Sequence, residues 1–524
     1  MSHTTRPPGE RQGRDPGPAS GAVSDPGTEP APDVAPSSAA PGVVQPGIVR
    51  GTRSWIVLAI TAALLGGSTV ALFLPLVPMA LGGAACLMML CLLFLRVPIA
   101  VAMLVPSLLG AYALRGLPLV ESTLTTMAYR QVATWTLSVV PMFILMGLLL
   151  WRAGITESMF KAARHWIGWV PGGLGVGTNL AGTGLAAVSG STLGTTYAIT
   201  RIGVPEMLRA GYDKRLAISS VVAAGLAGQL IPPSLLLVIY AGIAEVPIGP
   251  QLLAGIGPGL LVGVTFSAAI VLLAALRPGL AGRGAAVDAV RATWGDRFSS
   301  LVRVWPVPVL IGVIVIGMFS GVFTATEAGA VAALFSLVVT FVWKRGDRPW
   351  RAVSEAAIST VSTVGAIFLL LVAAGALAQM LTLSGISTAF ADFMEATDLG
   401  RVQFLLAMMV LYLILGMFMD TLTMMVLTVP IMLPTLAALE ISPLWFGVFV
   451  VFMGELGMLT PPVGILSFII HGIVKDPEVN LGQRIDLKDV LVGVAWVMPV
   501  AILVTLLLIG FPDLVTYIPD RAAG

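Results

Sequence analysis

Two apolar stretches of this 524-residue chain each carry a Pro-Pro pair in their middle, and this feature most constrains the fold. The stretches are AGQLIPPSLLLVIYAG at 227–242 and LGMLTPPVGILSFIIHG at 456–472. Pro232 and Pro461 are 229 residues apart (461 − 232 = 229). Because proline cannot donate the helical hydrogen bond, each pair should interrupt a helix. The same spacing relates four further identical pairs: Gly228 and Gly457, Leu230 and Leu459, Pro233 and Pro462, and Leu237 and Leu466.

Composition places these stretches in a membrane. Hydrophobic residues make up 57% and charged residues 11% of the sequence, and the mean hydropathy is +0.95. Soluble domains carry about 25% charged residues, so an all-α polytopic membrane protein is predicted. Unwound backbone inside a bilayer is tolerated where it lines a cavity. A duplicated broken helix therefore indicates a secondary transporter with its binding site near the membrane midplane.

The start of the chain has a different composition. Pro, Gly, Ala and Ser dominate the first fifty residues, and no aromatic residue occurs among them. Such a segment cannot bury enough apolar surface to offset the entropy of ordering, so residues 1–53 are predicted to be a disordered cytoplasmic tail. The apolar run that follows lacks a signal-peptide cleavage site, so residues 54–78 are predicted as an extra N-terminal transmembrane helix.

Apolar runs of about 18 or more residues predict about eleven membrane crossings. The expected spans are 55–77, 79–95, 97–114, 133–151, 216–243, 252–276, 304–320, 324–343, 356–383, 444–473 and 489–511.

Two further apolar stretches, 172–200 and 402–433, have polar residues in their middle. The first contains the tetrapeptide SGST, and the second contains Asp420 followed by a threonine. A polar break at bilayer depth suits the tip of a hairpin that faces a cavity. Both stretches are therefore predicted to be re-entrant helical hairpins, which enter and leave the membrane on one side.

Basic residues fall mainly in alternate loops, which predicts a cytoplasmic N-terminus and a periplasmic C-terminus by the positive-inside rule. Residues 79–279 and 304–512 then form two repeats, each with five crossings and one hairpin. An odd number of crossings gives the repeats opposite orientations, so the repeat is predicted to be inverted. Between them, residues 280–303 suit an amphipathic linker helix on the cytoplasmic surface. Residues 513–524 form a C-terminal tail.

The breaks and hairpin tips carry the oxygen atoms that a hard cation prefers. Unwound carbonyls, Ser and Thr hydroxyls and one carboxylate supply such ligands inside membranes. The alternative is that the hydroxyls merely bond neighbouring helices. The candidate sodium- or substrate-binding residues are Ser189, Gly190, Ser191, Thr192, Gly228, Ile231, Pro232, Pro233, Ser234, Asp420, Thr421, Thr423, Gly457, Thr460, Pro461, Pro462 and Gly464. Those proposed to hold sodium itself are Ser189, Ser191, Gly228, Asp420, Thr421, Gly457 and Thr460.

Among these candidates, Asp420 is the one most strongly indicated as a functional residue. A charge at bilayer depth costs roughly 3 kcal/mol on insertion scales, so an intramembrane acid is a functional residue by default. Glu455, in the span before the second break, competes with it for this role. A substrate carboxylate could be held by the half-helix N-termini after the breaks, whose free N–H groups and dipoles favour anions.

Several motifs in chain order resemble one family. They include AVSGSTLGTTYAITRIGVPEML (187–208), GQLIPPSLLLVIYAGIAE (228–245), GVFTATEAGAV (321–331), LGMFMDTLTMMVLTVPIMLP (415–434) and GMLTPPVGILSF (457–468). The chain resembles the large membrane subunit of the tripartite ATP-independent periplasmic (TRAP) transporters, the DctM-like proteins.

The resemblance implies a function and partners. We expect sodium-coupled uptake of an organic acid by an elevator mechanism across the bacterial inner membrane, with Na⁺ as coupling ion and no cofactor. The expected partners are a periplasmic solute-binding protein and a small four-helix membrane subunit in a separate chain. The helix at 54–78 resembles the connecting helix of fused forms, yet no four-helix segment precedes it.

Two other classes remain open. A stand-alone sodium- or proton-coupled organic anion carrier of the same architecture would need neither partner. An intramembrane enzyme is the outside alternative, but the sequence lacks HExxH and GxSxG motifs and paired intramembrane aspartates. We therefore expect a transporter that is not an enzyme and that binds no nucleic acid.

Overall fold

A computed structural model describes residues 52–95, 97–281, 293–346, 348–397, 400–461 and 464–522. Contacts divide the chain into two units, Met1–Trp55 and Ile56–Gly524. The second unit, as far as it is described, consists of helices and turns without a β-strand. Most of the predicted tail, 1–53, and Pro462 among the candidate ligands lie outside the described residues.

The first half of the described chain contains these helices: α1 (Thr52–Ala71), α2 (Pro78–Phe94), α3 (Ile99–Arg115), α4 (Leu117–Ser122), η1 (Thr123–Met127), α5 (Ala128–Val132), η2 (Trp135–Ser138), α6 (Val139–Arg152), α7 (Ile155–Ile167), α8 (Gly173–Ser189), α9 (Thr192–Arg209), α10 (Lys214–Gly228), α11 (Leu235–Ala244), α12 (Ile248–Ala254), α13 (Ile256–Leu276) and η3 (Pro278–Leu280).

The second half contains α15 (Trp294–Val304), α16 (Pro306–Phe319), α17 (Ala325–Trp343), α18 (Pro349–Ser384), α19 (Ile386–Ala396), α20 (Arg401–Gly416), α21 (Thr421–Ala438), α22 (Pro443–Gly457), α23 (Ile465–Ile473), α24 (Pro477–Asn480), α25 (Leu487–Gly510) and α26 (Asp513–Ala522).

The helix boundaries repeat along the chain with the spacing found in the sequence. Helices α9 and α21 begin 229 residues apart (421 − 192 = 229), and α10 and α22 do the same (443 − 214 = 229). Both members of each pair also end at equivalent residues. The internal repeat is therefore visible in the secondary structure itself, while the opposite orientation of its two copies stays a prediction.

Each Pro-Pro pair lies between two helices rather than inside one. In the first copy α10 ends and α11 begins on either side of Gln229–Ser234, and in the second α22 and α23 flank the segment that begins at Met458. The predicted hairpins likewise consist of two helices joined by a short break: α8 and α9 meet at Gly190, and α20 and α21 meet at Asp420.

These breaks divide apolar runs into shorter helices, so fewer single helices are long enough to count as membrane spans. Five described helices are long and apolar enough to cross a membrane, or up to seven if each bent helix pair counts as one span. Six shorter apolar helices accompany them. One of the five is α21, which the sequence analysis assigned to a hairpin. The number of eleven crossings and the re-entrant course of the hairpins stay predictions.

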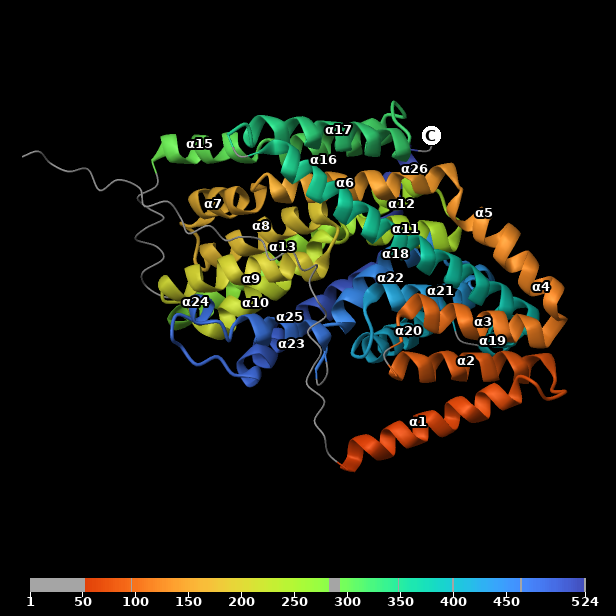
Figure 1. Cartoon of the computed structure of the whole chain (residues 1–524). Helices are drawn as coiled ribbons and strands as arrows, with labels where there is room; N and C mark the ends of the chain where they lie inside the picture. The colour runs from red at the N-terminus through yellow and green to blue at the C-terminus, as the bar shows by residue number, and fades with distance from the viewer. Residues whose placement is uncertain are drawn as a thin grey trace, which may run out of the picture. The chain divides into compact units, whose positions relative to one another are not determined.

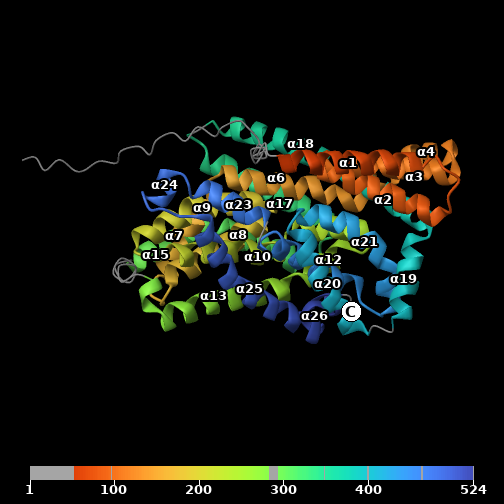
Figure 2. The same cartoon turned by 90° about the horizontal axis from the view of Figure 1, so that it is seen from below.

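The helices of each hairpin pack against the broken helix of the same repeat. Helices α8, α9 and α10 contact one another, as do α20, α21 and α22. In Figure 1 the first set, coloured yellow to yellow-green, lies beside α13, and the second set is blue. Figure 2 shows α6 beside α17, against which it packs. One buried cluster extends through both hairpins and both broken helices, so the tips are held by the main core.

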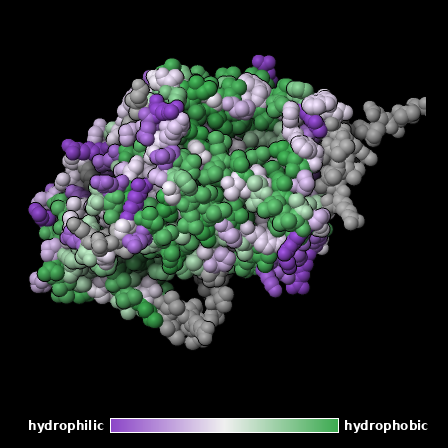
Figure 3. Space-filling view, turned by 180° about the vertical axis from the view of Figure 1, so that it is seen from behind, coloured by the Kyte–Doolittle hydropathy of each residue, from purple (hydrophilic) through white to green (hydrophobic). Residues whose placement is uncertain are grey.

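The outer surface is apolar over wide areas. Figure 3 shows a continuous expanse of hydrophobic residues, with hydrophilic residues gathered toward its margins. Exposed side chains there and elsewhere include Phe73, Val264, Leu334 and Val361, each more than 60% exposed. Large exposed apolar patches mark contact with lipid or a partner, which agrees with an all-helical membrane protein.

The predicted linker helix is present in part. Residues 282–292 lie outside the described chain, and α15 follows them with a capping box in which Thr293 and Asp296 satisfy each other's backbone N–H groups. The exposed side chains of Trp294 and Phe298 share this helix. Helix α15 packs along α7, and the indole of Trp166 donates to the carbonyl of Arg297 at 3.1 Å.

Candidate functional site

The tip of the first hairpin is built from three small residues. Helix α8 ends at Ser189, and Gly190 adopts the left-handed conformation (φ 62°) that lets the chain reverse. Ser191 then caps α9, and its hydroxyl accepts a hydrogen bond from the amide of Gly194 at 3.2 Å. The hydroxyls of Ser189 and Thr195 are 2.8 Å apart. The tip thus brings hydroxyl groups and a helix N-terminus to one place.

The first helix break presents a second set of polar groups. Ser234 caps α11 by accepting from the amide of Leu237 at 3.3 Å, and its hydroxyl donates to the carbonyl of Gln229. Gln229 is fully buried, and neither atom of its side-chain amide has a hydrogen-bond partner among the described residues. Ile231 packs its side chain toward Gly259 of α13, so only its backbone is available to a ligand.

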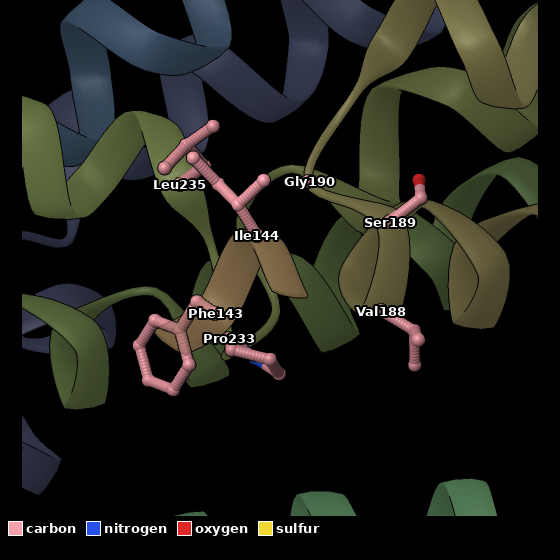
Figure 4. Close-up of a pocket in the computed structure, with 7 residues that line it drawn as sticks. All are labelled: Phe143, Ile144, Val188, Ser189, Gly190, Pro233 and Leu235. Carbon is pink, nitrogen blue, oxygen red and sulfur yellow. The ribbon is translucent and has the colours of Figure 1, made fainter. Parts of the chain in front are cut away.

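The first tip and the first break face a common pocket with α6. Phe143 and Ile144 of α6, Val188, Ser189 and Gly190 of the tip, and Pro233 and Leu235 of the break line it (Figure 4). A Cβ atom on Gly190 would lie 3.1 Å from Cβ of Leu235, and one on Gly147 of α6 would lie 2.4 Å from the carbonyl oxygen of Val188. Glycine therefore allows the tip to fit closely between α6 and α11.

The second tip is organised by a carboxylate instead of a serine. Asp420 caps α21: one oxygen accepts from the amide of Thr423 at 3.3 Å, and the other accepts from its hydroxyl. Asp420 stands where the first repeat has Ser191 (420 − 191 = 229). The hydroxyl of Thr421 donates at 3.1 Å to Glu455 of α22. The candidates Asp420, Thr421 and Thr423 therefore meet at one tip.

The backbone carbonyls of the second break accept hydrogen bonds from residues that follow them in the chain. The amide of Gly464 donates to the carbonyl of Thr460 at 3.0 Å, while the hydroxyl of Thr460 donates to Leu456 at 2.9 Å. The hydroxyl of Ser467 donates to the carbonyl of Leu459 at 3.2 Å. The hydroxyl hydrogen of Thr460 is donated to the helix backbone, so the lone pairs of its oxygen remain available as acceptors. Cation binding requires such acceptors.

Glycines hold each break against its hairpin. A Cβ on Gly457 would lie 2.7 Å from Cα of Gly416 and 2.8 Å from the carbonyl oxygen of Tyr412. A Cβ on Gly228 would lie 2.5 Å from the carbonyl oxygen of Thr183, the equivalent of Tyr412 (412 − 183 = 229). In both repeats the broken helix thus ends in backbone contact with the first hairpin helix.

The structure therefore brings most predicted site residues together within their own repeat. Ser189, Gly190 and Pro233 share the first pocket, and the second tip collects the threonines around Asp420. The proposed roles of Pro232 and Pro461 in binding sodium or substrate stay predictions. Among the described residues no group of three or more His, Cys, Asp or Glu side chains could hold a metal ion.

Glu455 contacts the site although the predicted ligand set did not contain it. It is 1% exposed and accepts the Thr421 hydrogen bond. The equivalent residue of the first repeat is Leu226 (455 − 226 = 229), so the internal repeat gives no indication of a polar group at this position. The signal available in the sequence was an acidic residue in an otherwise apolar span.

The sequence matches a family of known proteins. The family described as "Tripartite ATP-independent periplasmic transporter, DctM component" matches residues 86–514. The chain belongs to this family. The resemblance to TRAP large membrane subunits is thereby confirmed, and with it a multi-pass membrane transporter.

Relatives agree with this assignment. The chain is 32% identical over 394 residues to the C4-dicarboxylate TRAP transporter large permease protein DctM of Pseudomonas aeruginosa, covering 74% of this chain and 84% of that protein. It is 28% identical to the ectoine TRAP transporter large permease protein TeaC of Halomonas elongata, covering 82% and 97%. The solved YdaH transporter of Alcanivorax borkumensis shares the fold, with a TM-score of 0.59, 16% identity and coverage of 80% and 98%.

Proposed function

We propose that this chain is the large membrane subunit of a TRAP transporter that imports a small organic acid by sodium-coupled secondary transport. The observation that carries the proposal is the pair of hairpin tips, each set against a broken helix at equivalent positions of the repeat. Helix ends and unwound carbonyls are the usual sites for substrate and coupling ion in such carriers. The relatives, which are named for C4-dicarboxylate and ectoine, suggest the size of the cargo.

The groups at the tips suit both ligands. Ser191 and Ser234 cap α9 and α11, and the N-termini of helices favour anions such as carboxylates. Asp420, with the acceptor oxygens of Thr421 and Thr460, offers a hard cation the oxygen ligands it prefers. We propose that the cation binds at the tips first and that the substrate then binds between the two repeats.

Delivery is proposed to depend on partners. A periplasmic solute-binding protein would bring the substrate to the outer face, and a small four-helix membrane subunit in a separate chain would complete the assembly in the inner membrane. Family membership supports both partners. A stand-alone organic anion carrier remains the alternative, because nothing in the second unit of the chain itself requires them.

Sodium dependence can be tested in proteoliposomes that contain the chain, its small subunit and the binding protein loaded with C4-dicarboxylate. Uptake should require an inward sodium gradient and should cease when choline replaces sodium at constant pH. Potassium, the larger ion, should not substitute for sodium. Equal uptake in sodium and in choline would overturn sodium coupling and point to a proton gradient.

A further inference from the structure

Helix α15 carries an exposed apolar side. Trp294, Phe298, Val302 and Trp305 follow one another at intervals of three or four residues, which places them on one side of the helix. These residues are between 44% and 68% exposed. Phe298 touches the edge of Trp166 on α7, with 6.1 Å between the ring centroids, and is still more exposed than buried. Among the described residues this apolar side therefore lies open.

The rest of the surface of α15 differs from this side. The helix packs along α7, and Ser300 is its buried residue. Gly295, Ser299 and Arg303 are spaced four residues apart, so they form a separate polar side, and all three are exposed. A helix with one packed side, one open apolar side and one open polar side suits the boundary between lipid and water.

The chain continues from α15 directly into an apolar helix. Only Trp305 separates α15 from α16, and the two helices meet at a bend of 50°. Helix α16 occupies the predicted crossing 304–320 and has an exposed apolar side of its own, formed by Val309, Val313, Ile316 and Phe319. Such a side on a membrane helix faces lipid. The open apolar side of α15 is therefore followed at once by a lipid-facing surface.

A basic side chain without an acidic partner lies beside this apolar side. The guanidinium carbon of Arg297 is 5.0 Å from the centroid of the Trp294 ring, and its Nε has no hydrogen-bond partner among the described residues. Arg297 takes part in no ion pair of the described chain. Its neighbour Asp296 instead accepts from the amide and the hydroxyl of Thr293. A guanidinium in this situation can bind a phosphate through two parallel hydrogen bonds.

We propose that α15 is a binding surface for anionic phospholipid. Trp294, Phe298, Val302 and Trp305 insert beneath the headgroups, and Arg297 binds the phosphate above them. Two observations favour lipid over a protein partner as the occupant: the apolar side leads directly into the exposed side of α16, and the basic group beside it lacks a carboxylate. An anionic headgroup such as phosphatidylglycerol also lacks an ammonium group that would compete with the guanidinium. This inference does not depend on the proposed function.

Labels on neighbouring residues can locate the two open sides of α15. Phe298→Cys and Ser299→Cys place a fluorophore on the apolar and on the polar side, so each is the matched control of the other. Both are made in the full chain with Cys86 and Cys91 replaced by alanine, and are reconstituted in phosphatidylglycerol nanodiscs, which leave both membrane faces open to solvent. Lipids with a spin label near the headgroup should quench the fluorophore at 298 more strongly, and aqueous iodide should quench the one at 299 more strongly.

Amide hydrogen exchange of the full chain then tests the headgroup site. Exchange over Trp294–Val304 should be about fivefold slower in phosphatidylglycerol nanodiscs than in phosphatidylcholine nanodiscs. Arg297→Gln should remove most of this difference. Arg303→Gln is the matched control, because it removes the same charge from the polar side of the helix, and it should keep most of the difference. Inorganic phosphate added to the phosphatidylcholine nanodiscs should not slow exchange.

Four results would overturn the proposal. Equal iodide quenching of both labels would show that the apolar side faces water, and protection of the 298 label from both quenchers would assign this side to another protein chain. Equal losses in Arg297→Gln and Arg303→Gln would indicate attraction to surface charge without a headgroup bound at Arg297, and slowing by inorganic phosphate would indicate a site for the free ion. If the chain without cysteines fails to fold, the exchange measurement, which keeps both cysteines, still decides.

Discussion

Asp420 combines two tasks at the second tip. Its carboxylate caps α21 through the amide and hydroxyl of Thr423, and it is the acid that we propose to bind the cation. Capping does not require a charge, since asparagine caps helices as well as aspartate does. Binding a cation in a low-dielectric site does depend on charge. A substitution that separates the two tasks is therefore available.

We expect Asp420→Asn to fold normally and to transport poorly. The amide keeps the cap and lowers the cost of burial, but it removes the charge that balances the ion. Uptake should fall at least about tenfold, and the sodium concentration for half-maximal uptake should rise. Sodium titration of uptake in proteoliposomes measures both quantities. Thr421→Val, which deletes a single hydroxyl, is the milder comparison, and unchanged sodium dependence in Asp420→Asn would transfer the ion-binding role to other oxygen atoms.

At the scale of the elements, the ends of the broken helices are fixed by backbone contact. Gly416 ends the first helix of the second hairpin and touches Gly457, which ends α22. A Cβ on Gly416 would meet the Cα of Gly457 at 2.6 Å, a separation that requires one helix to shift. The position of the tip relative to the break therefore depends on the absence of side chains at both residues.

Gly416→Ala should destabilise the protein. The intruding methyl group outweighs the roughly 1 kcal/mol that alanine gains over glycine in a helix. We expect a lower midpoint of thermal unfolding in detergent, together with reduced uptake. Gly312→Ala on α16 is the control, because no atom lies within 4 Å of its added Cβ, and it should leave the midpoint unchanged or raise it. Equal midpoints for the two variants would refute the packing argument.

Helix α15 offers an element-scale test of a different kind. Its N-terminus depends on the reciprocal hydrogen bonds of Thr293 and Asp296. Replacing Thr293 by alanine should cost about 1 kcal/mol of local helix stability, because the cap is lost. Amide hydrogen exchange over Trp294–Val304 should become faster, while exchange in α7 should change less. Ser299→Ala, an exposed change outside the cap, should have little effect on either helix.

At the scale of the whole second unit, ion pairs join the two repeats at one end of the helices. Lys214 and Arg215 at the start of α10 both bind Asp489 at the start of α25, at 2.6 and 3.1 Å. Arg201 of α9 binds Asp476, which precedes α24, at 2.7 Å. The two repeats thus touch through charged side chains at this end. Such paired contacts suit two halves that move as units.

Partner dependence is the prediction at this scale. We expect uptake by the reconstituted chain and small subunit to require the substrate-loaded binding protein, because family membership implies delivery by a soluble partner. Free substrate without the binding protein should give only background uptake. The same rate with and without the binding protein would favour a stand-alone carrier. Weak affinity of the binding protein alone would not, since delivery complexes can be transient.

The sequence predicted those parts of the molecule that local chemistry determines. Proline pairs located both helix breaks, because proline cannot donate the helical hydrogen bond, and polar residues in the middle of apolar stretches located the tips. It named Glu455 as a competitor of Asp420 but did not predict its hydrogen bond to Thr421, and it did not predict that Ile231 packs toward α13. Both contacts depend on which helices pack together. It also could not fix the number of crossings, because length alone does not tell a span such as α21 from half of a hairpin.

The contact between Gly416 and Gly457 has a mechanical consequence. The two backbones approach so closely here that neither helix end can shift toward the other, since packed protein interiors are hardly compressible. The end of α20 and the end of α22 should therefore move together as one rigid block. Any opening of the second tip must then come from bending in the short link from Met417 to Asp420, a hinge four residues long whose stiffness would set how fast the carrier turns over.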